Sequence, residues 1–203
     1  MDSFDFSLFA PKAAYFYLRF LDGIGRKTWG FPVHTGRELP SQEIPELEPI
    51  SKKGVIATDT VSGEDASSLI SDDPLTFYTS AEKTCSILLD LNDEHEVCAL
   101  GHYPKLFFEN PKQLRRDGID PAALCAQFPY EYRLYAGNDK ETLSLVAEGV
   151  FRVFGGEEFI LFPERTSRFL RLDVLSTIGA FSKVKAYENE RVTIGELTPF
   201  KKK

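Results

Sequence analysis

Two adjacent carboxylates, Asp72 and Asp73, stand directly before a proline, and the hydroxyl of Thr76 follows closely. Carboxylate and hydroxyl oxygens gathered on a short loop are the hard donors that a cation such as calcium prefers. Pro74 fixes its own φ and pushes Asp73 towards extended backbone, so the turn is stiff. The alternative is an ordinary solvated loop, because Asp and Pro are common turn residues. Asp72, Asp73 and Thr76 are therefore the candidate metal ligands.

The segments around this loop alternate between apolar and polar residues, which predicts β-strands. In residues 85–91, for example, Ile87, Leu89 and Leu91 fall on one face. Strands are expected at 54–58, 85–91, 97–103, 130–136, 143–147, 149–154, 158–162, 168–175 and 183–187, with one short helix at 120–127. Many short strands and little helix predict an all-β protein, an antiparallel β-sandwich.

A polar stretch rich in proline and glutamate, 36–49, is expected to be a linker. Before it, residues 14–21 and 27–34 flank an Asp-Gly turn and predict a β-hairpin within 1–35. This hairpin is either the end of a preceding β-sandwich domain or a pair of strands that joins the following domain. The sandwich is expected to span 50–190, and residues 191–203 to form a C-terminal tail.

The formal net charge of −7 argues against a nucleic-acid partner, because no basic stripe is available to neutralise phosphates. No apolar run is long enough to cross a bilayer, so no membrane insertion is expected. The start of the chain is acidic and has no signal-peptide pattern. Cys85, Cys98 and Cys125 match no metal motif and are expected to be free, mostly buried thiols.

The sequence also lacks the arrangements that enzymes use. The three histidines, His34, His95 and His102, have no metal-ligand spacing, and no nucleophile–base pattern or phosphate loop is present. Adjacent carboxylates such as Asp72 and Asp73 cannot flank a glycosidic bond as two catalytic carboxylates must. We therefore expect a protein that is not an enzyme.

Six sequence blocks follow one another between residues 50 and 189. They read LISDDPLTFY (69–78), ILLDL (87–91), HEV through YPK (95–105), YRLYAGND (132–139), SRFLRL (167–172) and SKVKAY (182–187). In kind and order they resemble the discoidin, or coagulation-factor type C, domain. That resemblance implies a galactose-binding-like jelly roll, a fold shared with carbohydrate-binding modules, but it does not by itself specify a ligand.

In many relatives of this kind a structural calcium is held by loop carboxylates, the loop threonine and a glutamate near the last strand. Here Asp73 and Thr76 keep their positions, Ser71 replaces the first aspartate, and Lys183 occupies the late glutamate position. Because an ammonium cannot ligate a cation, we expect no cofactor and a Lys183 that reaches Asp73 in place of the ion. Calcium bound by Asp72, Asp73, Thr76 and backbone carbonyls is the alternative.

The resemblance further implies a sugar site on the rim loops. In galactose-binding relatives a histidine follows the loop aromatic and an arginine follows the proline after the fourth strand, whereas Thr79 and Lys105 stand at those positions here. Sugar sites combine an aromatic platform with polar groups for the hydroxyls. An insertion at 104–130 either adds binding specificity, or covers the sandwich or docks on a neighbouring domain. The expected ligand contacts are Tyr78, Thr79, Tyr103, Lys105, Phe107 and Arg116.

The resemblance thus implies a non-catalytic carbohydrate-binding or adhesion module of a larger secreted or surface protein. Its partner would be a glycan or a neighbouring domain of the parent protein, and its location extracellular, periplasmic or at the cell surface. The alternative is a structural or interdomain β-sandwich module without a sugar site of its own.

Overall fold

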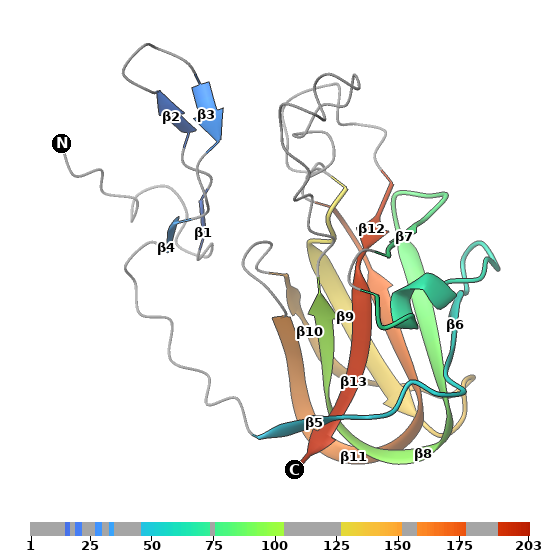
Figure 1. The fold of residues 1–203 in the computed structure, drawn as a ribbon. Coiled ribbons are helices and arrows are strands. Elements are labelled where there is room, and N and C mark those ends of the chain that lie inside the picture. The colour runs from blue at the N-terminus through green and yellow to red at the C-terminus, as the bar shows by residue number, and fades with distance from the viewer. Residues whose placement is uncertain are drawn as a thin grey trace. The chain divides into compact units, whose positions relative to one another are not determined.

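The computed structural model describes residues 46–73, 76–103, 127–151, 158–177 and 191–203, together with the backbone of four short strands before residue 35. The chain divides into two compact units (Figure 1). Met1–Ile44 and Arg152–Gly155 form the first, and Pro45–Phe151 and Gly156–Lys203 form the second.

The described strands of the first unit pair in two short antiparallel ladders. They are β1 (Tyr15–Phe16), β2 (Arg19–Leu21), β3 (Lys27–Trp29) and β4 (Val33–His34). β1 pairs with β4, and β2 pairs with β3. This nested order is that of a hairpin. That the hairpin ends a preceding domain stays a prediction.

The second unit is a set of antiparallel strands, which confirms the predicted all-β class. The strands are β5 (Leu47–Pro49), β6 (Ile56–Asp59), β7 (Tyr78–Thr79), β8 (Cys85–Tyr103), β9 (Glu131–Gly137), β10 (Ser144–Val150), β11 (Glu158–Val174), β12 (Thr193–Ile194) and β13 (Glu196–Lys202). One 3₁₀ helix, η2 (Ser67–Ile70), lies between β6 and β7. No described helix is long and apolar enough to cross a membrane.

Two long strands, β8 and β11, take part in both layers of the sandwich. The first half of β8 pairs with the last half of β11, and these halves also pair with β6 and β9, respectively. The second half of β8 pairs with the first half of β11 on one side and with β13 on the other. The register shifts between Leu161 and Arg165 and between Ser167 and Phe169, and Asn92 has φ 72° on the opposing strand. Both strands curve sharply at the foot of the view in Figure 1. β-Bulges of this kind bend a strand without ending it.

The sequence predicted separate strands at 85–91 and 97–103 and again at 158–162 and 168–175. Each pair is instead one continuous strand. The polar residues at the bends interrupt the alternation of apolar side chains, but the backbone pairing resumes beyond them. Periodicity reports side-chain burial, whereas strand continuity depends on backbone hydrogen bonds.

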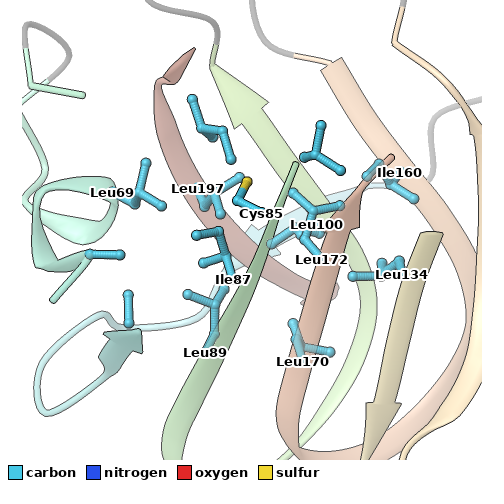
Figure 2. Packing of buried hydrophobic residues seen from close by; sticks show 14 of the residues in the cluster. Leu69, Cys85, Ile87, Leu89, Leu100, Leu134, Ile160, Leu170, Leu172 and Leu197 are labelled. Carbon is cyan, nitrogen blue, oxygen red and sulfur yellow. The ribbon is translucent and has the colours of Figure 1, made fainter. Parts of the chain in front are cut away.

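The core lies between the layers and is made by the apolar faces of the long strands (Figure 2). Ile87 and Leu89 of β8 and Leu170 and Leu172 of β11 are almost wholly buried, and Leu69 of η2 joins them from the side. Burying each such side chain contributes about 1.5–3 kcal/mol. The predicted alternation in these strands is therefore confirmed.

The C-terminal segment is part of the sheet, so the predicted tail at 191–203 is wrong. β13 pairs with β8 and also with β5, which lies inside the predicted linker 36–49. Leu197 is 0% exposed, and the Pro199 carbonyl accepts a hydrogen bond from the Ile50 amide. A proline and a terminal run of lysines are poor strand signals, which is why the sequence favoured a tail. The predicted helix residues 120–126 and strand 183–187 lie outside the described residues.

Candidate functional site

The oxygen-rich loop predicted as a cation site begins where η2 ends. Asp72 has φ 61°, in the left-handed region that only a few residue types tolerate. The Thr76 hydroxyl lies 2.7 Å from the Ser68 carbonyl oxygen and 2.8 Å from that of Asp73, and it also contacts the Ser71 hydroxyl. The Thr76 amide donates to the Asp73 carbonyl at 3.0 Å. These groups hold the loop by bonding to one another.

A lysine side chain reaches the same loop from another part of the chain. Lys52 Nζ lies 2.9 Å from Asp72 Oδ1 and also contacts Glu196 Oε1. The side chains of Lys52 and Glu196 are only 6% and 16% exposed, whereas that of Asp72 is 75% exposed. The ammonium is therefore largely removed from water and its charge is matched by two carboxylates.

The second carboxylate that contacts Lys52 belongs to Glu196, the first residue of β13. β13 pairs with β8 on one side and with β5 on the other. Lys183 lies outside the described residues, so its predicted contact with Asp73 stays a prediction. In the described part of the chain, no group of three or more His, Cys, Asp or Glu side chains could hold a metal ion. The donor set around Lys52 does not fit calcium.

Tyr78 was predicted as a sugar platform, and the structure places it in the core instead. Its ring is 6% exposed, and its hydroxyl donates to Asp59 Oδ2 at 2.8 Å and lies 3.1 Å from Glu64 Oε2. Burial is the main cause that raises the pKa of Tyr78, and the Asp59 carboxylate adds to it. A ring enclosed in this way cannot offer its face to a ligand, so this prediction is wrong.

The residues on either side of Tyr78 differ from it in exposure. Phe77 directly precedes β7 and Thr79 is its second residue, and both are more exposed than Tyr78. Phe77 is 40% exposed. The Thr79 and Thr193 hydroxyls are 3.1 Å apart, and Thr193 donates to Gln127 Oε1 at 2.7 Å. An exposed ring and a short row of polar groups therefore lie along the β7–β12 pair.

Of the remaining predicted contacts, Tyr103 is half-buried at the end of β8, directly opposite Glu196 on β13. Directly opposed residues of neighbouring strands share one side of a sheet. Tyr103 therefore lies on the same side of the sheet as Glu196, which contacts Lys52. Lys105, Phe107 and Arg116 lie outside the described residues.

The sequence analysis missed Lys52, Glu196 and Phe77. A signal for Glu196 was present, because Leu197 and the later Phe200 are apolar residues that could belong to a further strand beginning at Glu196. Phe77 could have been chosen over Tyr78 by noting that only one of two adjacent strand residues faces the core. No sequence signal distinguishes Lys52 from its neighbour Lys53.

Two of the solved structures that match this fold are carbohydrate-binding modules. CpGH89CBM32-5 from Clostridium perfringens, in complex with GalNAc-β-1,3-galactose, matches with a TM-score of 0.56 at 18% identity, covering 76% of this chain and 100% of that one. The family 32 module of Clostridium perfringens NanJ, in complex with galactose, matches with a TM-score of 0.56 at 16% identity, covering 76% of this chain and 99% of that one.

A third match is a fragment of a putative chitobiase from Bacteroides thetaiotaomicron, with a TM-score of 0.56 at 16% identity over 79% of this chain and 95% of that one. No family model matches the sequence, and no curated protein matches it. The structural matches show that the chain has the discoidin, or family 32 carbohydrate-binding-module, type of fold.

Proposed function

We propose that this chain is a non-catalytic module that binds a glycan through the rim beside β7 and belongs to a larger secreted or surface protein. The observation that carries the proposal is the match to the full length of two modules solved with galactose-containing sugars. Fold alone does not specify a ligand, so the proposal also depends on the side chains at this rim.

Phe77 supports the proposal because an exposed aromatic ring can pack against the apolar face of a sugar. Thr79 of β7 supplies a hydroxyl, and Gln127 is linked to it through Thr193. Hydroxyl and amide groups bind sugar hydroxyls by hydrogen bonds. This set replaces Tyr78 in the predicted site. Lys105, Phe107 and Arg116 remain proposed contacts from the insertion.

Titration of the protein with galactose, N-acetylgalactosamine, fucose and galactose-containing disaccharides tests the function. Saturable binding is expected with at least one of them. Phe77→Ala should weaken it roughly 10-fold or more, since loss of a stacked ring costs about 1.5 kcal/mol. Leu145→Ala is the matched control, because Leu145 is 49% exposed and lies on β10, in a different sheet from β7. Equal effects of the two substitutions would contradict the proposed site.

The second candidate is a structural or interdomain module without a sugar site. It is favoured by the burial of Tyr78 and by the engagement of the Thr79 and Thr193 hydroxyls with each other. Absence of binding across a broad glycan array would support this candidate and contradict the first.

A further inference from the structure

Asp72, which follows η2, contacts a positively charged group that belongs to the protein. We propose that the ammonium of Lys52 takes the place of a metal ion at the loop that begins where η2 ends, so that the fold here is independent of calcium. Lys52 Nζ lies 2.9 Å from Asp72 Oδ1 and contacts Glu196 Oε1, and its side chain is 6% exposed. This inference does not depend on glycan binding.

The three side chains come from separate parts of the fold. Lys52 stands in the turn before β6, Asp72 follows η2, and Glu196 opens β13, 144 residues after Lys52. A structural cation stabilises a protein by joining distant oxygen ligands. The ammonium has three donors, so it can join two carboxylates in the same way by charge-assisted hydrogen bonds.

Calcium does not fit the same position. It requires about 6–8 oxygen ligands at about 2.3–2.6 Å. The Thr76 hydroxyl already lies within hydrogen-bond distance of the carbonyls of Ser68 and Asp73. The ammonium lies against the carboxylates of Asp72 and Glu196, and it would repel a divalent ion placed beside them. The site is therefore complete without a metal.

Thermal unfolding with and without calcium tests the proposal. The melting temperature of the wild-type protein is expected to be the same in millimolar calcium chloride and in EDTA. Lys52→Met should lower the melting temperature by roughly 5–10 °C, since it leaves Glu196 buried without its partner. Lys53→Met is the matched control, because Lys53 is the adjacent lysine and is exposed. It should change the melting temperature by about 1 °C or less.

Two results would overturn the proposal. One is a melting temperature of the wild-type protein that rises with calcium. The other is a Lys52→Met protein whose melting temperature equals that of Lys53→Met. If Lys52→Met fails to fold, Glu196→Gln keeps the shape of the side chain and removes its charge, with Glu94→Gln as the control at an exposed position. A loss confined to Glu196→Gln supports the proposal, and equal melting of these two variants contradicts it.

Discussion

Two ion pairs of this protein join different elements of the second unit but lie in different surroundings. Lys52 and Glu196 are 6% and 16% exposed, whereas Arg133 and Glu148, which join β9 and β10 at 3.3 Å, are 48% and 61% exposed. Water screens the Arg133–Glu148 pair and readily replaces its contacts, so this pair contributes little to the free energy of unfolding. The first pair cannot lose one partner without leaving a poorly hydrated charge. Burial, more than the presence of opposite charges, determines how much each pair matters.

Two other buried ionisable side chains, those of Asp59 and His102, extend this comparison. Asp59 is 1% exposed and accepts hydrogen bonds from the Val61 and Ser86 amides as well as from Tyr78. His102 is 3% exposed, and its ring lies 4.7 Å from that of Phe151. Its Nε2 has no hydrogen-bond partner among the described residues.

Beyond the Lys52 variants, the largest expected effect is a loss of stability at acid pH caused by His102. Burial lowers the pKa of His102 to about 4, from an ordinary value of 6.5. Between these values the unfolded chain binds a proton that the folded protein does not. The free energy of unfolding is therefore highest above pH 6.5 and falls as the pH drops towards 4, by about 2 kcal/mol between pH 7 and 4.5.

Urea unfolding of the wild-type protein and of His102→Gln at several pH values measures this effect. Carboxylates also titrate near the lower end of the range, and the guanidinium of Arg168 lowers the pKa of Asp90. Both proteins share that contribution, so the difference between their pH profiles isolates His102. Parallel profiles would show that buried His102 does not resist protonation.

A smaller loss is expected from Tyr78→Phe. The substitution keeps the buried ring and removes the hydroxyl that donates to Asp59 Oδ2 at 2.8 Å. A buried carboxylate oxygen that loses one donor costs about 1–2 kcal/mol of unfolding free energy. Tyr135→Phe is the control, since its ring packs against the Arg171 guanidinium at 4.3 Å and that contact survives the change. The comparison would fail if both variants were equally stable in urea.

The smallest effect is expected for the exposed pair. A double-mutant cycle of Arg133→Ala and Glu148→Ala should give a coupling energy of about 0.5 kcal/mol or less, because both side chains remain largely hydrated. Denaturant midpoints of the four proteins provide the measurement. A coupling similar to that of a buried pair would remove the distinction between the two sites.

The sequence predicted the fold well because each layer has one buried face. Ile87, Leu89, Leu170 and Leu172 alternate with polar residues, and this period of two specifies which side of each strand is covered. The prediction was weaker at β13, where Pro199 and the final lysines concealed a strand. Backbone pairing with β8 and β5 provides the stability that the local sequence of this segment does not indicate.

The candidate site was predicted only in outline. The loop oxygens of Asp72, Asp73 and Thr76 were chosen as candidate ligands from their spacing, whereas the positive charge beside them was expected from the resemblance and was assigned to Lys183. The local sequence does not indicate whether Phe77 or Tyr78 has the exposed ring, because either of two adjacent aromatic residues can face the core. Phe77 is 40% exposed and Tyr78 is 6% exposed.

By itself, therefore, the sequence determined the β-sandwich and the acidic loop, since both follow from the order of neighbouring residues. Only the tertiary structure decided that Lys52 meets this loop and that Glu196 closes the cluster. These residues lie 144 positions apart, and nothing in the local sequence separates Lys52 from Lys53. Which charges are buried together depends on how the turn before β6, the end of η2 and the start of β13 pack.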